Sequence, residues 1–199
     1  MRVRYGGYRG FNMTPIWVLL AVNFLFYIAY LIQDDLILRT FGFQPNQFLS
    51  EPWTIVTNMF VHAGLWHILA NMLMLYFFGS YLLGLLGEVK FFIVYFAGGL
   101  VGNLLFYLLA PAYAIAVGAS GALFAVMGAM AVMRPRLKVL IWFLFPVDLW
   151  ILIIVIAALI IPTQIESSNI AWQAHVGGLV LGLIAGLYFR KKERGRFWG

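Results

Sequence analysis

Four polar residues occupy stretches of the chain that are otherwise apolar: Ser120, His175, His67 and Asn71. Ser120 lies between two glycines in GASGA (118–122), and His175 precedes the small-residue run VGGLVLG. Serine is a weak nucleophile until a base takes its proton, and the near-neutral pKa of histidine suits that task. No acidic residue is placed to orient His175. The two residues therefore predict acyl transfer by a Ser–His dyad.

Acyl transfer also needs donors for a developing oxyanion. His67 and Asn71 are four residues apart and share one helix face, so both can donate from the same side. The backbone N–H of Ser120, at a predicted helix start, adds a third donor. The loss of one such donor can cost about 2.7–4 kcal/mol of transition-state stabilisation. Phe124, one turn after Ser120, is expected to pack against the imidazole.

Each of these residues also has a structural interpretation. A serine among small residues often serves helix packing, and a His/Asn pair can form hydrogen bonds between helices. The three histidines, His62, His67 and His175, could together bind a metal ion. However, the chain has no cysteine and no HExxH motif, and no carboxylate is predicted beside the histidines, so a metal site is not favoured.

The composition indicates a membrane protein. The 199 residues are 64% hydrophobic and 10% charged, whereas soluble domains carry about 25% charged residues. A helix that crosses the hydrocarbon needs about 20 apolar residues. The sequence therefore predicts an all-α bundle of six transmembrane helices in a single domain, 1–199. The predicted spans are 15–32, 65–86, 91–110, 114–133, 149–161 and 171–189.

Three connecting segments are less regular. Residues 33–64 form a long outer loop between the first two spans, and their aromatic content places them partly in the outer interface. Pro146 and Asp148 resemble the start of the short fifth span. Residues 139–147 are then expected to lie along the interface, and residues 162–170 to cap the outer end.

Basic residues orient the bundle. Of the 13 lysines and arginines, only Arg39 falls on the side opposite the two termini, which predicts cytoplasmic termini. The basic residues are expected to act as topology anchors and to contact anionic lipid, so the net charge of +6 does not imply nucleic acid. The expected location is the cell membrane, with the site open to the extracellular side. No feature specifies an oligomeric state.

This topology places the candidate residues in one layer. Spans two, four and six all run inward, so His67, Asn71, Ser120 and His175 each fall a few residues below the outer surface. Small residues spaced by four allow close helix contact. Such residues follow both Ser120 and His175, so contact between spans four and six would bring the imidazole to the hydroxyl. They include Gly121, Ala125, Gly128, Gly178 and Gly182.

Three motifs resemble those of the rhomboid family of intramembrane serine proteases, in its minimal six-span prokaryotic form. The resemblance covers nearly the whole chain. GASG resembles GxSG, HAGLWHILAN resembles HxxxxHxxxN, and AHVGGLVLG resembles AHxxGxxxG. The matching residues are Gly118, Ser120 and Gly121, then His62, His67 and Asn71, then His175, Gly178 and Gly182.

The resemblance implies a Ser120–His175 dyad and an oxyanion site formed by His67, Asn71 and the Ser120 amide. It implies hydrolysis of peptide bonds in or next to transmembrane segments of other membrane proteins, without metal or cofactor. It gives His62 a structural role. The chain departs from the family at Thr54, where many members have arginine, and at Leu83, where many have glutamate.

Two alternatives belong to other functional classes. A rhomboid-like binding protein without catalysis usually lacks the serine or the histidine, and this chain has both. A small transporter would have polar residues along a whole pathway and often repeated halves. Here the polar residues are concentrated at one depth, and the chain shows no repeat.

Overall fold

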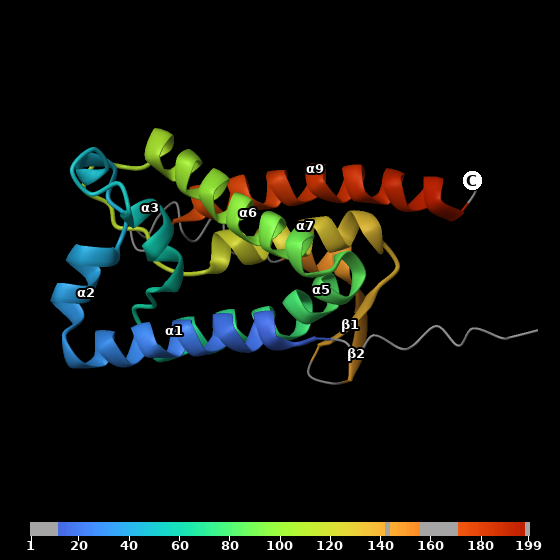
Figure 1. Ribbon diagram of the computed structural model, residues 1–199, viewed down its shortest axis with the longest axis horizontal. Coiled ribbons are helices and arrows are strands. Elements are labelled where there is room, and N and C mark those ends of the chain that lie inside the picture. The colour runs from blue at the N-terminus through green and yellow to red at the C-terminus, as the bar shows by residue number, and fades with distance from the viewer. Residues whose placement is uncertain (1–11, 142–143, 156–170, 198–199) are drawn as a thin grey trace, which may run out of the picture.

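A computed structural model describes residues 12–141, 144–155 and 171–197 (Figure 1). The described chain is mostly helical. Its helices are α1 (Thr14–Ile32), α2 (Asp34–Phe41), α3 (Thr54–Thr57), α4 (Leu65–Met74), α5 (Ser80–Leu86), α6 (Glu88–Leu109), α7 (Ser120–Met133) and α9 (Trp172–Phe197). Shorter turns are η1 (Pro45–Gln47), η2 (Asn58–Phe60) and the π-helical turn η3 (Leu75–Gly79), and two strands are β1 (Lys138–Ile141) and β2 (Phe145–Asp148).

Four helical segments are long and apolar enough to cross a membrane. They are Thr14–Ile32, Leu65–Leu86, Glu88–Leu109 and Trp172–Lys191. The second is continuous through α4, η3 and α5. These segments correspond to the first, second, third and sixth predicted spans, and they make the chain an integral membrane protein. Gly87, with φ +79°, allows the sharp turn between α5 and α6.

The fourth predicted span begins later than expected. The prediction was 114–133, but α7 starts at Ser120. The preceding residues are not helical, and Ala116 instead exchanges two backbone hydrogen bonds with Phe43, at 3.0 and 2.9 Å. Gly118 then adopts φ +115°, which interrupts any helix. The backbone donors and acceptors of this loop are bonded to another segment, which sequence periodicity does not reveal.

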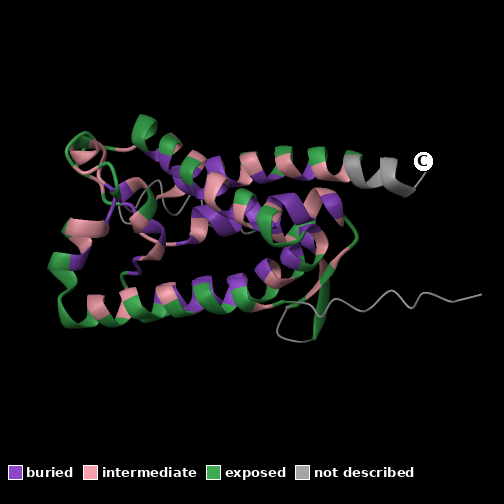
Figure 2. Cartoon of the chain, in the orientation of Figure 1, coloured by how far each residue is buried: buried purple, intermediate pink, exposed green. Residues whose placement is uncertain are grey.

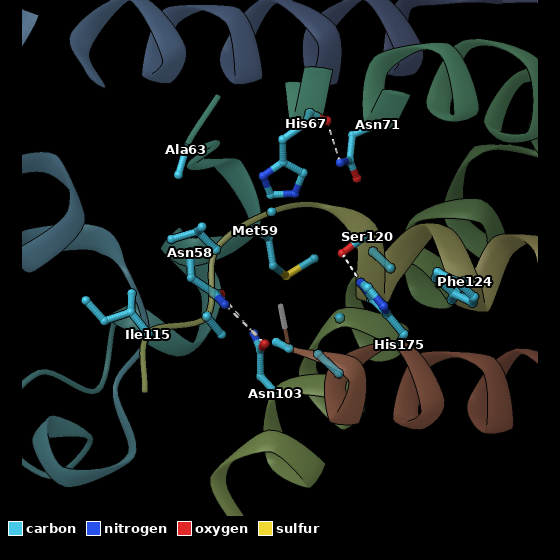
Figure 3. A pocket seen from close by; sticks show the side chains of 18 of the residues that line it. Asn58, Met59, Ala63, His67, Asn71, Asn103, Ile115, Ser120, Phe124 and His175 are labelled. Carbon is cyan, nitrogen blue, oxygen red and sulfur yellow. Dashed lines mark hydrogen bonds between the residues drawn. The ribbon is translucent and has the colours of Figure 1, made fainter. Parts of the chain in front are cut away.

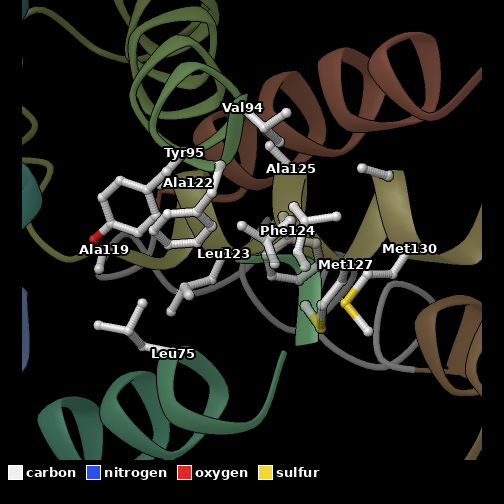
Figure 4. Packing of buried hydrophobic residues seen from close by; sticks show 14 of the residues in the cluster. Leu75, Val94, Tyr95, Ala119, Ala122, Leu123, Phe124, Ala125, Met127 and Met130 are labelled. Carbon is white, nitrogen blue, oxygen red and sulfur yellow. The ribbon is translucent and has the colours of Figure 1, made fainter. Parts of the chain in front are cut away.

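The 14-residue helix α7 lies at the centre of the protein. Eleven of its residues are buried (Figure 2). The helix is apolar on every side, which is typical of a helix enclosed by protein. It packs against α6 and α9. Figure 4 shows part of this core, which includes Leu75, Val94 and Tyr95 from neighbouring elements and Leu123 and Met127 of α7. Because protein surrounds α7, the helix does not need the length of a lipid-exposed span.

The segment before the fifth span forms a hairpin. β1 and β2 pair antiparallel, with Lys138 opposite Asp148 and an ion pair of 3.6 Å between them. Pro146 lies within β2 rather than at a helix start. Residues 149–155 are helical, as predicted, whereas the rest of the fifth span and the cap 162–170 lie outside the described residues. The predicted helical fold therefore gains a two-stranded sheet.

The connection 33–64 contains α2, η1, α3 and η2. It lies at one end of the long helices, and the hairpin lies at the other end (Figure 1). At the two departures from the family pattern, both side chains are buried. The Thr54 hydroxyl donates to the Glu51 carbonyl at 2.6 Å, and Leu83 belongs to the core.

The α7–α9 contact depends on glycine. A Cβ at Gly178 would collide with the Gly121 carbonyl oxygen, and one at Gly182 with the Ala125 carbonyl oxygen. The two helices therefore approach to backbone contact. This contact fixes the distance between the first turns of α7 and α9, where Ser120 and His175 lie.

We expect Gly178→Ala to weaken this contact. The added methyl group must separate α7 from α9, and such overpacking typically costs about 1–3 kcal/mol of unfolding free energy. Thermal unfolding in detergent would measure the loss. Leu187→Ala, on an exposed part of α9, is the matched control and should change the melting temperature less. Equal melting temperatures for the two variants would contradict this interpretation of the interface.

Candidate active site

The loop before Ser120 is held by the end of the 33–64 connection. The Gly118 N–H donates to the Asn58 carbonyl at 2.9 Å, and the Ala119 N–H donates to His62 Nε2 at 3.4 Å. The next amide, that of Ser120, is the first of α7 and has no hydrogen-bond acceptor in the described part of the chain. A free N–H at a helix start is a ready donor for an anion.

Ser120 and His175 lie within hydrogen-bond distance of each other. Their Oγ and Nε2 atoms are 2.7 Å apart (Figure 3). The imidazole stacks on Phe124, with ring centroids 4.7 Å apart and an interplanar angle of 16°. His175 is buried, and its Nδ1 has no partner among the described residues. A hydroxyl beside an imidazole can serve as an activated nucleophile.

A cavity of about 420 Å³ opens beside this pair, and Ser120, His67, Asn71 and His175 all line it. His67 is close to the loop: a Cβ added to Gly118 would lie 2.6 Å from His67 Nε2 and 3.8 Å from Ser120 Oγ. Glycine at 118 therefore leaves room for the His67 ring next to the hydroxyl. The positive φ of this residue favours glycine as well.

Asn71 is buried on the same helix face as His67. Its Nδ2 donates to the His67 carbonyl at 2.8 Å, while its Oδ1 is buried and has no partner in the described segments. An amide nitrogen carries two N–H groups. One remains for a ligand in the cavity after the bond to His67 is made.

His62 contacts the loop from outside the cavity. Its Nε2 accepts from Ala119, so its Nδ1 carries the proton and donates to the Phe60 carbonyl at 3.3 Å. The His62 and His67 rings meet edge to face, with centroids 4.9 Å apart. Burial, with a smaller contribution from His67, lowers the pKa of His62 from 6.5 to about 3. His62 therefore stays neutral at physiological pH.

This pKa predicts a loss of stability in acid. Between about pH 6.5 and pH 3, His62 binds a proton in the unfolded chain but not in the folded chain. The unfolding free energy should fall by up to about 1.4 kcal/mol per pH unit as the pH drops through this window. Melting temperatures in detergent from pH 7 to pH 4 would measure it. His62→Gln should be less stable at pH 7 but have a shallower pH dependence, and equal slopes would refute the assignment.

The structure thus brings Ser120, His175, Phe124, His67 and Asn71 to one place, with Gly118 and Gly121 beside them in the cavity wall. His62 lies behind the loop, and Gly178 and Gly182 lie in the α7–α9 interface.

Two further polar residues line the cavity, Asn58 and Asn103, and neither belongs to the sequence motifs. Asn103 lies inside a predicted apolar span. A polar residue at membrane depth is itself a signal of function, and this signal could have identified it. Asn58 lies in the connecting segment and carried no comparable signal.

Comparisons with known proteins agree with these motifs. A family model described as Rhomboid domain matches residues 49–192. The chain is 34% identical to "Putative rhomboid protease YdcA" of Bacillus subtilis over 73% of this chain and 71% of that protein. It is 32% identical to "Rhomboid protein 1, mitochondrial" of Saccharomyces cerevisiae, over 76% and 46% of the two chains. It is 30% identical to "Rhomboid protease GluP" of Bacillus subtilis, over 80% of this chain and 31% of that protein.

Proposed function

Because the chain belongs to the rhomboid family, we propose that it is an intramembrane serine endopeptidase with Ser120 as nucleophile and His175 as general base. The observation that supports this assignment most directly is the 2.7 Å distance between Ser120 Oγ and His175 Nε2. Relatives named as proteases support the reaction class.

In the first half of the reaction, His175 Nε2 takes the hydroxyl proton while Ser120 Oγ attacks the scissile carbonyl carbon. The resulting tetrahedral intermediate carries an oxyanion. The His67 ring, the second Asn71 N–H and the unpaired Ser120 N–H are its proposed donors, since all three groups belong to residues that line the cavity. The imidazolium then protonates the leaving amine, and an acyl-enzyme remains on Ser120.

In the second half, a water molecule attacks the acyl-enzyme. His175 removes the proton from the water and returns it to Ser120 Oγ, which releases the new carboxyl group. Besides the side chains already named, the proposed steps use the Ser120 backbone N–H and one water molecule. Phe124 lies flat against the imidazole and limits its rotation, so it acts as a positioning residue for His175.

The proposed substrates are membrane proteins cleaved in or next to a transmembrane segment. The six-span topology, the cytoplasmic termini and the location in the cell membrane, with the site facing outward, remain part of this proposal. They are supported by the distribution of basic residues and by the four apolar helices. Membrane lipid surrounds the bundle and holds the substrate helix in the same plane.

The test is direct. The purified 199-residue chain, in proteoliposomes, would be mixed with single-span membrane proteins, and the products would be mapped by mass spectrometry. A fluorophosphonate probe would be applied in parallel. We expect cleavage at defined bonds and labelling of Ser120. If neither cleavage nor labelling occurs with a panel of substrates, the proposal fails and the non-catalytic binding alternative replaces it.

A further inference from the structure

Two buried asparagines on different elements form a reciprocal pair. Asn58 Nδ2 donates to Asn103 Oδ1 at 3.1 Å, and Asn103 Nδ2 donates to Asn58 Oδ1 at 2.8 Å (Figure 3). Asn103 Nδ2 also donates to the Ile55 carbonyl at 2.7 Å. The side chains are only 2% and 4% exposed. Together these bonds fix the 55–58 segment on the membrane helix α6.

The pair is linked to the loop before Ser120 by one backbone bond. The Asn58 side chain is held by Asn103, and the Asn58 carbonyl accepts the Gly118 N–H at 2.9 Å. Gly118 is two residues before the proposed nucleophile, and a Cβ there would touch the His67 ring. A shift of the Asn58 backbone therefore moves the loop relative to both Ser120 and His67.

We propose that Asn58 and Asn103 are positioning residues, which place the 117–119 loop so that the Ser120 hydroxyl and amide are correctly aligned. This inference rests on the proposed function. Neither amide touches the Ser120–His175 pair, and the amides satisfy each other rather than facing the reacting atoms. The pair acts through the Asn58 carbonyl and Gly118.

The key variant is Asn103→Leu, because Asn103 lies on α6 and its side chain bonds, among the described residues, to Asn58 and Ile55 alone. The matched control is Asn23→Leu. Asn23 is equally buried, but it lies on α1, and its Nδ2 donates to the Leu19 carbonyl of its own helix at 2.7 Å. Each substitution replaces one buried asparagine side chain by a leucine side chain of similar size.

We expect Asn103→Leu to lower kcat by about 10- to 100-fold with little change in KM, since small misplacements in an active site have effects of this size. Hydrogen exchange at the Gly118 amide should accelerate by about tenfold, because its acceptor is no longer fixed. Asn23→Leu should lower the melting temperature and leave both quantities unchanged. All measurements would be made at a temperature at which each variant is folded.

The double variant Asn58→Leu/Asn103→Leu separates an effect on positioning from an effect on stability. It also replaces the single variant in these measurements if the single variant does not fold. It leaves no side-chain amide unpaired, and only the Ile55 carbonyl loses its donor, so its melting temperature should lie between those of the single variant and the wild-type protein. Its kcat should stay low and its Gly118 exchange fast. Wild-type kcat and exchange in either the single or the double variant would overturn the proposal. If the wild-type protein cleaves nothing, the proposed function fails, and Gly118 exchange alone still decides this inference.

Discussion

Ser120→Ala and His175→Ala should each abolish proteolysis. The hydroxyl and the imidazole are 2.7 Å apart, and no other described side chain within hydrogen-bond distance of Ser120 Oγ can take its proton. In serine proteases, removal of one member of the nucleophile–base unit costs about as much as removal of the whole unit, at least about 10⁴-fold in kcat. Cleavage of a single-span substrate in proteoliposomes, followed over long incubations, would measure the residual rate.

Two controls accompany these variants. Ser80→Ala removes a hydroxyl that lies outside the cavity, on α5, where it bonds the Tyr76 carbonyl, so this variant should cleave at the wild-type rate. Melting temperatures of Ser120→Ala and His175→Ala would show that both variants fold. The double variant should be no slower than the singles, because the two residues act as one unit. Persistent cleavage in either single variant would refute the dyad.

The meeting of Ser120 and His175 could be predicted because two simple patterns determine it. The distribution of basic residues predicts the direction of each span and therefore a common depth for the polar residues. Small residues spaced by four on α7 and α9 allow backbone contact, and the structure has Gly178 against the Gly121 carbonyl. Depth and contact together place the imidazole beside the hydroxyl.

The loop before Ser120 could not be predicted in the same way. Its conformation depends on bonds to Phe43, Asn58 and His62, which are more than 50 residues away along the chain. Single backbone hydrogen bonds between distant segments leave no periodic trace in a sequence. The small and apolar residues of 114–119 therefore predict part of a span, although Gly118 at φ +115° ends any helix there.

The hairpin was missed for a different reason. Residues 138–148 read KVLIWFLFPVD, a nearly unbroken apolar run without the alternation that marks a half-buried strand. Such a run does not distinguish a strand from a buried helix. The ion pair between Lys138 and Asp148 lies at the base of the hairpin and depends on the register of the strands, which the run does not specify.

Loss of an oxyanion donor should have the second largest effect on activity. We expect Asn71→Ala and His67→Ala each to lower kcat by about 10²- to 10³-fold and to leave KM nearly unchanged, because the bond forms only as charge develops on the substrate oxygen. Both side chains line the cavity with Ser120, and Asn71 has an N–H to spare beyond its bond to the His67 carbonyl. Steady-state kinetics with a fluorogenic membrane substrate would separate kcat from KM.

Asn23→Ala is the matched control for Asn71→Ala. Both asparagines are buried, both donate to the carbonyl four residues earlier on their own helix, and both have an Oδ1 without a partner in the described chain. They differ in location, because Asn23 lies on α1 and does not line the cavity. A similar fall in kcat for both variants would assign Asn71 to helix stability alone. A fall confined to Asn71→Ala, with labelling of Ser120 by the fluorophosphonate slowed in proportion, would place its amide at the oxyanion, since that probe also develops negative charge on oxygen when serine attacks.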